Sequence, residues 1–234
     1  MGAGTVARPQ EAHSRVIGVP ARGRFVTFEG IEGSGKSTQI VRLAERLRAL
    51  GRSVLVTREP GGTEIGGRLR GILLDPSAPS IDPVAEMLLY AADRAQHLAE
   101  IVEPALACGE IVLCDRYLDA TLAYQGYGRE LGCEFILEIH RRPPLDRRPD
   151  RTVLLDLDPA TGVTRALARD AALGTSATAG RFEAEALAFH ERVREGYLLL
   201  AEQEPARFVV LDGSGTPEQI ADRVWQAVRG ALDR

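Results

Sequence analysis

Residues 28–38 read FEGIEGSGKST, and this stretch decides which fold the chain can form. Gly30, four further residues, and then Gly35, Lys36 and Ser37 match the phosphate-binding pattern G-x-x-x-x-G-K-[ST]. The pattern requires a strand before the loop and a helix after it. Both are present, because the apolar run RFVTFE leads into the loop and the amphipathic run STQIVRLAERLRAL leaves it. The stretch therefore indicates a loop whose backbone amides surround a phosphate group.

Lys36 is the only lysine in a chain with 29 basic side chains, so arginine supplies every other basic position. This usage indicates that position 36 is one that arginine cannot fill. A compact ammonium fits between phosphate oxygens, whereas a planar guanidinium does not occupy the same slot. Ser37 offers a hydroxyl ligand for Mg²⁺. The residues predicted to hold ATP and its Mg²⁺ are Gly30, Ile31, Glu32, Gly33, Ser34, Gly35, Lys36, Ser37 and Thr38.

Composition limits the classes of function that remain. A net charge of -4 over 234 residues argues against a nucleic-acid partner, although a local basic groove stays possible. No apolar run has the length of a membrane span, and the first residues lack the apolar core of a secretory signal. The three cysteines have no metal-ligand spacing and suit reduced thiols. We therefore expect a cytoplasmic protein without a nucleic-acid or membrane partner.

Apolar runs along the chain alternate with helical patterns. Five of these runs are short and mostly continuous, as expected for strands buried on both faces. They cover residues 24–29, 53–59, 110–116, 151–158 and 207–213. Helical patterns cover about 37–50, 63–74, 82–107 and 217–232, among other segments. This order predicts an α/β fold with a five-stranded parallel sheet and helices on both of its faces, that is, three layers.

The chain is predicted to form a single domain over residues 24–234. Residues 1–23 show no sustained period and contain several turn formers, so we expect a flexible N-terminal tail. A short insert over about 165–183 is rich in small residues near its end and is a candidate lid. A solvated connection between two helices remains the alternative for this segment.

Ligands of parallel α/β sheets gather beyond the carboxyl ends of the strands, and polar clusters follow several strands here. Asp115 ends the third predicted strand and could hold Mg²⁺ through water, together with Ser37. Arg116 follows it, and Arg94 lies on the preceding helical pattern among several tyrosines. Arginines that grip an acceptor phosphate and aromatic rings that stack on a base would form a nucleoside monophosphate site.

Two large classes of nucleotide-binding protein are disfavoured. The GTPase motif N-K-x-D needs asparagine, which is absent from this chain, and the LSGGQ signature of transporter ATPases is also absent. Kinases of small molecules therefore become prominent. The sequence resembles the bacterial thymidylate kinases over about residues 24–232, through FEGIEGSGKST, TREPGGTEIG, LLYAADRAQH, DRYLDATLAYQGYGR, RTVLLDLDPATG and FHERVREGYLLLA. The resemblance implies a P-loop kinase fold and transfer of the γ-phosphoryl group of ATP to dTMP, with Mg²⁺ and as a homodimer.

The same resemblance implies roles for individual residues. Arg94 and Arg116 match arginines that grip the dTMP phosphate, and Tyr90 falls where a ring stacks on thymine. Tyr124 would pack against the sugar and could disfavour a 2′-hydroxyl. The implied substrate-binding set is Glu32, Glu59, Pro60, Arg70, Tyr90, Arg94, Arg116, Thr121, Tyr124 and Gln125. The implied catalytic set is Lys36, Arg116, Arg165 and Arg169, and the implied metal ligands are Ser37 and Asp115.

Three departures from the family pattern bear on these roles. Ala120 stands where serine is common, Gly180 stands where an acidic or amide residue is usual, and the lid itself is long and rich in small residues. Relatives with glycine at the position of Gly33 depend on a lid arginine, for which Arg165, Arg169 and Arg181 are candidates. Two other functions remain open: a kinase for another nucleoside monophosphate or a nucleoside, and a nucleotide-binding protein without catalysis.

Overall fold

The sheet has the predicted number of strands, and they are parallel as predicted. In the computed structural model, which describes residues 22–75, 77, 79–172 and 185–232, five parallel strands follow the order β2-β3-β1-β4-β5. Their bounds are β1 Arg24–Glu29, β2 Val54–Arg58, β3 Ile111–Asp115, β4 Arg151–Asp156 and β5 Phe208–Asp212. The predicted strand over 151–158 ends two residues early, because the Asp158 carboxylate accepts the Thr161 N–H and begins the next helix.

Helices connect the strands and continue beyond the last one. They are α1 Lys36–Ala49, α2 Glu64–Leu74, α3 Pro83–His97, α4 Glu103–Ala107, α5 Leu118–Thr121, α6 Cys133–Ile139, α7 Pro159–Ala172, α8 Leu187–Gln203 and α9 Pro217–Leu232. Two π-helical segments, η1 Leu98–Val102 and η2 Leu122–Gly128, continue α3 and α5. The helix predicted over 82–107 is thus divided at η1, just before Pro104, which lacks the N–H that a regular helix requires.

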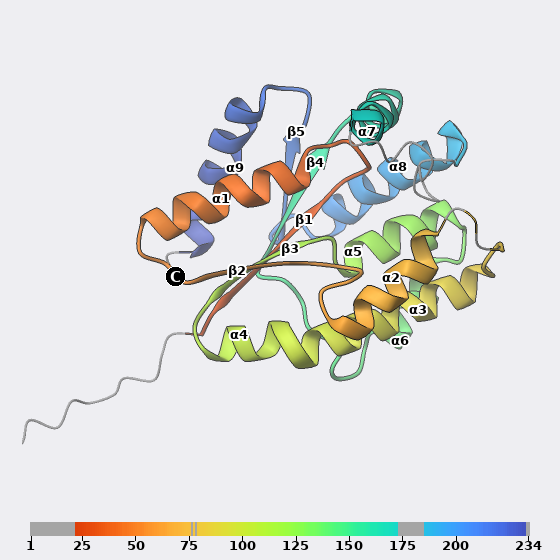
Figure 1. Ribbon diagram of the computed structural model, residues 1–234, viewed down its shortest axis with the longest axis horizontal. Helices are drawn as coiled ribbons and strands as arrows, with labels where there is room; N and C mark the ends of the chain where they lie inside the picture. Colours follow the sequence, from red (N-terminus) through yellow and green to blue (C-terminus); the bar gives the residue numbers. More distant parts are fainter. Residues whose placement is uncertain (1–21, 76, 78, 173–184, 233–234) are drawn as a thin grey trace, which may run out of the picture.

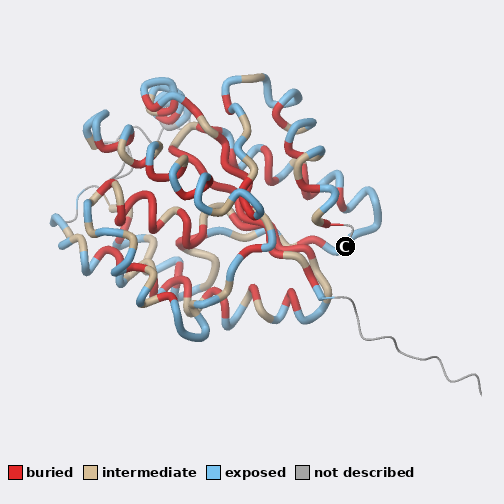
Figure 2. The backbone as a smooth tube through the Cα atoms, turned by 180° about the vertical axis from the view of Figure 1, so that it is seen from behind, coloured by how far each residue is buried: buried red, intermediate tan, exposed pale blue. Residues whose placement is uncertain are grey.

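Helices cover both faces of the sheet, as predicted (Figure 1). Successive β1 residues point to opposite faces: Val26 and Phe28 pack with α1 and α9, while Phe25 packs with the helices on the other side. Figure 2 shows the buried strands running between these helical layers. None of the helices in the described ranges combines the length and apolar character of a membrane span.

Strands β1 and β3 are neighbours, so their carboxyl ends place the phosphate loop beside residues 115–129, which begin at the end of β3. Glu59 and Arg116 follow neighbouring strands, and their backbone amides pair with Asp115 O at 2.9 Å and Phe28 O at 3.0 Å. At the other end of the sheet, the Gly23 N–H donates to Leu106 O at 2.9 Å. Most of the predicted tail, and residues 173–183 of the predicted lid with Gly180 and Arg181, lie outside the described residues.

Candidate active site

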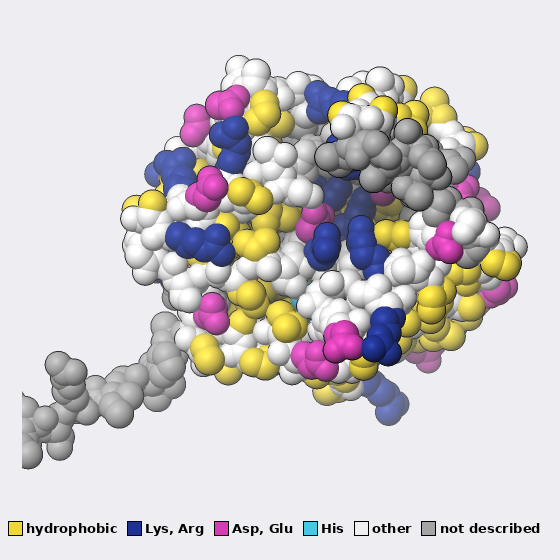
Figure 3. Space-filling view, viewed as in Figure 1, with side chains coloured by type: hydrophobic (Ala, Val, Ile, Leu, Met, Phe, Trp, Pro, Cys, Tyr) yellow, Lys and Arg dark blue, Asp and Glu magenta, His cyan; other side chains and the backbone are white. Residues whose placement is uncertain are grey.

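A cavity of about 560 Å³ opens at the carboxyl ends of the strands. Figure 3 shows this hollow face, with Lys and Arg side chains gathered in it. Its walls contain the predicted residues Glu32, Gly33, Gly35, Lys36, Ser37, Thr38, Glu59, Pro60, Arg70, Tyr90, Arg94, Asp115, Arg116, Thr121, Tyr124, Gln125, Arg165 and Arg169. The predicted loop residues Gly30, Ile31 and Ser34 do not line the cavity and lie behind its wall. The fold therefore brings the phosphate loop and the predicted acceptor-binding residues into one cavity.

The Lys36 ammonium lies against the phosphate loop itself. Its Nζ donates to Gly30 O at 2.9 Å and to Ile31 O at 2.8 Å. Burial lowers the pKa of Lys36 to about 8, and the nearby Arg116 adds to this effect. The loop thus holds a partly desolvated cation on its own carbonyl oxygens, at the wall of the cavity.

Gly33 shows why this loop position is glycine. Its φ is +71°, a conformation that side chains disfavour. A Cβ at this position would also lie 2.1 Å from Gly162 O and 3.1 Å from the Arg165 Cβ, both on α7. The first turn of α7 therefore packs directly on the phosphate loop and positions Arg165 next to it.

The two predicted metal ligands, Ser37 and Asp115, are in contact, since the Ser37 hydroxyl donates to Asp115 Oδ2 at 2.7 Å. They come from the first turn of α1 and the last residue of β3. Both are hard oxygen donors, and Mg²⁺ uses one or two protein oxygens together with water and phosphate oxygens. No group of three or more His, Cys, Asp or Glu side chains in the described part of the chain could hold a metal ion. This pair fits Mg²⁺ bound with a nucleotide.

Arg116 crosses the cavity from the end of β3. Its Nη2 donates to Glu32 Oε1 at 2.8 Å and to the Tyr124 hydroxyl at 3.0 Å. The guanidinium carbon lies 4.7 Å from the centre of the Tyr124 ring. Its backbone has a φ of +67°, which is uncommon for a residue with a side chain. Local strain and several partners thus fix one orientation of this cation.

Glu32 completes this cluster, because its Oε2 accepts a hydrogen bond from the Tyr124 hydroxyl at 2.7 Å. Burial would raise the pKa of Glu32, but Arg116 and then Lys36 outweigh it and hold the pKa below its ordinary value. Glu32 is therefore an anion among cations, within the loop that precedes Lys36.

Two residues behind Arg116 were not predicted as part of the site. The Tyr197 hydroxyl, on α8, accepts from Arg116 Nη1 at 3.2 Å and donates to Glu29 Oε2 at 2.8 Å. Burial raises the pKa of Glu29 to about 8, and the charge of Asp119 adds to it. Both residues lie within quoted motifs, but neither motif indicates that they meet.

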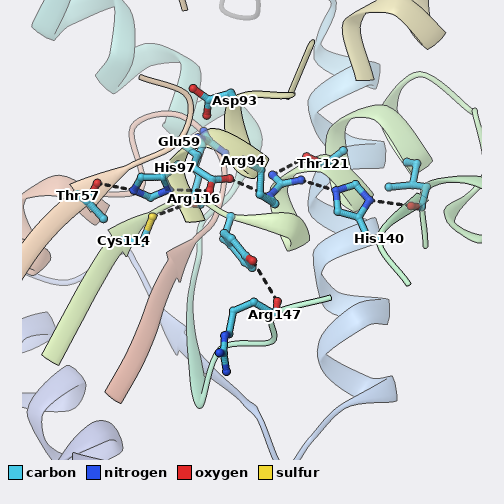
Figure 4. A network of polar contacts seen from close by, with 12 residues as sticks. Thr57, Glu59, Asp93, Arg94, His97, Cys114, Arg116, Thr121, His140 and Arg147 are labelled. Carbon is cyan, nitrogen blue, oxygen red and sulfur yellow. Dashed lines mark hydrogen bonds and ion pairs between the residues drawn. The ribbon is translucent and has the colours of Figure 1, made fainter. Parts of the chain in front are cut away.

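Arg94 is buried at the acceptor end, with a side chain that is 1 % exposed. Figure 4 shows its three nitrogens held by three partners. Nε donates to Glu59 Oε2 at 2.8 Å, and Nη2 donates to Thr121 Oγ1 at 3.0 Å. Nη1 lies 2.8 Å from His140 Nε2. The guanidinium also lies over the Tyr117 ring, with 5.0 Å between its carbon and the ring centre.

The network continues on the other side of Glu59, where His97 Nδ1 lies 2.8 Å from Oε1 (Figure 4). Neither His97 nor His140 was predicted as part of the site. The LLYAADRAQH motif could have indicated His97, because it follows Arg94 by almost one helical turn. His140 has no such signal. Arg58 and Leu74 also line the cavity without having been predicted, and so does Tyr117, which is one of the tyrosines near Arg94 and Arg116 in the sequence.

The remaining predicted residues support the cavity walls. Arg70 Nη1 donates to Pro60 O at 3.0 Å, and Gln125 Nε2 donates to Glu86 Oε1 at 2.8 Å. Arg165 Nη1 donates to Gly213 O at 3.1 Å, so this lid candidate is held near the loop after β5. Ala120, one of the departures, faces the cavity.

The phosphate loop follows the carboxyl end of the central strand β1, and the Arg116 guanidinium lines the same cavity. Together with the parallel sheet, these features define a phosphotransferase with a P-loop kinase fold. Comparison with known proteins makes this class specific. The chain belongs to the thymidylate kinase family, because the family's sequence profile, described as thymidylate kinase, matches residues 28–224.

Individual relatives agree with this assignment. The chain is 55 % identical over 204 residues to a thymidylate kinase of Solidesulfovibrio magneticus, covering 87 % of this chain and 98 % of the relative. It is 53 % identical to one of Syntrophotalea carbinolica, over 89 % of this chain and 96 % of the relative. The crystal structure of the Ehrlichia chaffeensis thymidylate kinase matches with a TM-score of 0.71 and 31 % identity, over 89 % of this chain and all of that one.

Proposed function

We propose that this chain transfers the γ-phosphoryl group of ATP to dTMP, giving dTDP and ADP. One observation carries the proposal: the same cavity of about 560 Å³ is lined by Lys36 and Ser37 of the phosphate loop and by Arg94 and Tyr124 opposite. Donor and acceptor phosphates could therefore meet in a space enclosed by cations. The names of the relatives, all thymidylate kinases, support dTMP as the acceptor.

At the donor end, Lys36 would leave its loop carbonyls to bind the bridging and transferred phosphate oxygens. Its hydrogen bonds to Gly30 O and Ile31 O already place it at the mouth of the loop. Ser37 and Asp115 would hold Mg²⁺, which neutralises charge on the phosphates when it is bound. The protein would then act mainly by positioning and charge neutralisation.

At the acceptor end, Arg116 and Arg94 would hold the dTMP phosphate, with Tyr90 and Tyr124 against the base and sugar. The fixed orientation of Arg116 supports its role, because a preorganised cation needs little rearrangement when charge develops. A phosphate oxygen is nucleophilic enough to attack without a strong base. Arg165 and Arg169 on α7 are the described candidates for the arginine that stabilises the transferred group.

An ADP-release assay with several acceptors tests the proposal. We expect rapid ATP- and Mg²⁺-dependent turnover of dTMP and slower turnover of dUMP, dCMP and thymidine. Fastest turnover of another monophosphate would favour the alternative substrate specificity. ATP binding without turnover of any of these acceptors would favour a nucleotide-binding protein without catalysis.

A homodimer in the cytoplasm completes the proposal. Exposed apolar side chains on the packed helices α2 and α3 support a second copy as the partner, notably Ile65, Ile72 and Leu88. The free thiols of the three cysteines agree with a reducing compartment. Light scattering behind a sizing column tests the assembly, and a mass equal to one chain of 25.3 kDa would exclude the dimer.

A further inference from the structure

His140 connects the end of α6 to the guanidinium of Arg94. The residue follows Ile139, the last residue of α6, and its ring Nδ1 lies 2.8 Å from Ile136 O. Its Nε2 lies 2.8 Å from Arg94 Nη1. The ring is thus held at both of its nitrogens. His140 is 5 % exposed and does not line the cavity.

The chemistry of the two partners determines the protonation state of this ring. A carbonyl oxygen can only accept, so Nδ1 must carry the proton that bonds to Ile136 O. A guanidinium can only donate, so Nε2 must be unprotonated to accept from Arg94. His140 is therefore a neutral imidazole with its proton on Nδ1. Consistently, burial and then the charge of Arg94 lower the pKa of His140 to about 4.

The partners of Arg94 leave part of its donor capacity unused. A guanidinium carries five N–H groups. Glu59, Thr121 and His140 each take one of them, on three different nitrogens. One further N–H remains on each terminal nitrogen, while Arg94 itself lines the cavity. The plane of the guanidinium, and with it the direction of these two N–H groups, depends on all three partners.

We propose that His140 is a positioning residue of the acceptor site, whose unprotonated Nε2 fixes the Arg94 guanidinium in the orientation that receives the acceptor nucleotide. This inference rests on the proposed function and assigns a role to a residue that touches no substrate. A carboxylate in place of His140 would hold the guanidinium more tightly, but it would add a second anion beside Glu59. A neutral acceptor orients Arg94 while leaving its charge available.

Few side chains can fill this position. The residue must donate to Ile136 O at one end and accept from Arg94 at the other. Neutral histidine, asparagine and glutamine carry a donor and an acceptor on two separate atoms, whereas a hydroxyl has to use a single oxygen for both functions. Histidine meets the requirement here with its two ring nitrogens, one facing Ile136 O and the other facing Arg94.

Steady-state kinetics of His140→Leu and His140→Gln test the inference. Leucine removes the acceptor, whereas the longer amide of glutamine returns an oxygen near the position of Nε2. We expect His140→Leu to raise the KM for dTMP about tenfold, as for loss of a hydrogen bond to a charged group, with the KM for ATP nearly unchanged. We expect His140→Gln to recover most of this loss. A parental KM for dTMP in His140→Leu would overturn the inference.

A merely structural role as a cap of α6 predicts a different pattern. In that case the KM values for dTMP and ATP would rise together, or His140→Leu and His140→Gln would lower the melting temperature alike, without a selective loss of dTMP binding. Either result would also overturn the inference. NMR of the parent protein with ¹⁵N-labelled histidine gives an independent readout. We expect His140 Nε2 to be unprotonated at neutral pH, and a protonated Nε2 would count against the inference. A parent protein that does not turn over dTMP would overturn the proposed function itself, and this inference with it.

Discussion

The Glu32 carboxylate and the Arg116 guanidinium form an ion pair within the cavity, with 2.8 Å between Oε1 and Nη2. Both side chains are largely buried, so the pair is less screened than one on the surface. Tyr124 contacts both partners through its hydroxyl. The cation is therefore oriented by the protein before any phosphate binds.

Arg116→Lys should be far from conservative. A lysine ammonium has a single nitrogen and cannot reproduce the planar fork in which Nη2 bonds to Glu32 while Nη1 bonds to Tyr197. We expect kcat/KM for dTMP to fall about 100-fold, as after loss of one preorganised donor. The ADP-release assay measures this effect, and a value within a few-fold of the parent would contradict the role of Arg116.

Removing the Lys36 ammonium should abolish most turnover. For Lys36→Ala we expect a loss of about a thousandfold in kcat, from lost stabilisation of charge in the transition state. Lys36→Arg should not restore activity, because Nζ lies between two carbonyl oxygens in a buried space. Arg42→Ala, at an exposed ion pair on α1, is the matched control and should keep parental turnover.

The pKa of Lys36 predicts the alkaline limb of the pH profile. Because that pKa is lowered to about 8, the free protein loses this positive charge as the pH rises through 8. We expect kcat/KM for ATP to be constant below about pH 7 and to decline above pH 8, since this ratio reports the free enzyme. The limb should be much weaker in kcat, because bound phosphates favour the protonated amine. A flat kcat/KM up to pH 9.5 would exclude this assignment.

Stability should depend on pH through Glu29, whose pKa is raised to about 8 from 4.5. As the pH rises, this carboxyl ionises in the unfolded chain before it ionises in the folded one. Its contribution to the free energy of unfolding is therefore fully present below pH 4.5 and is lost as the pH rises through 8. Glu29→Gln removes this ionisation. We expect the free energy of unfolding of the parent to fall relative to that of the variant between pH 5 and pH 8.5. Urea titrations at both pH values measure this difference, and an equal change in the two proteins would contradict it.

Gly33→Ala should destabilise the fold. The new Cβ would meet Gly162 O at 2.1 Å, at a backbone φ of +71°. We expect a loss of about 2 kcal/mol or more in the free energy of unfolding, from steric overlap and backbone strain. Gly71→Ala is a suitable control, because it lies in the exposed interior of α2 with no neighbour within 4 Å. That control should be neutral or slightly stabilising.

The sequence was sufficient to predict the five strands and their parallel arrangement. Apolar runs mark strands that are buried on both faces, and helical runs between them require parallel crossovers. The order in which β4 and β5 extend the sheet beyond β1 has no such local signal, because it depends on long-range packing. The π segment η1 was also missed, since an apolar period does not distinguish it from an α-helix.

Part of the cavity wall was predictable from position, because Glu59, Asp115 and Arg116 lie at or just after the ends of strands. Wall residues on helices, such as Arg94, were predicted through the family resemblance. The residues behind the wall were not. Tyr197 meets Glu29 across 168 positions, and His140 meets Arg94 across 46. These side chains are buried on helices, where a tyrosine or histidine resembles an ordinary core residue in the sequence. Their contribution becomes visible only when hydrogen-bond partners are known.

The contact between Gly33 and Gly162 also constrains how such a sequence can diverge. The first turn of α7 occupies the space that a side chain on the loop would need. Moving a cation from the helix to the loop therefore takes two coordinated changes, one that withdraws the helix and one that adds the new residue. A side chain at position 33 therefore depends on a shift of α7, and the loop and this helix are expected to change together.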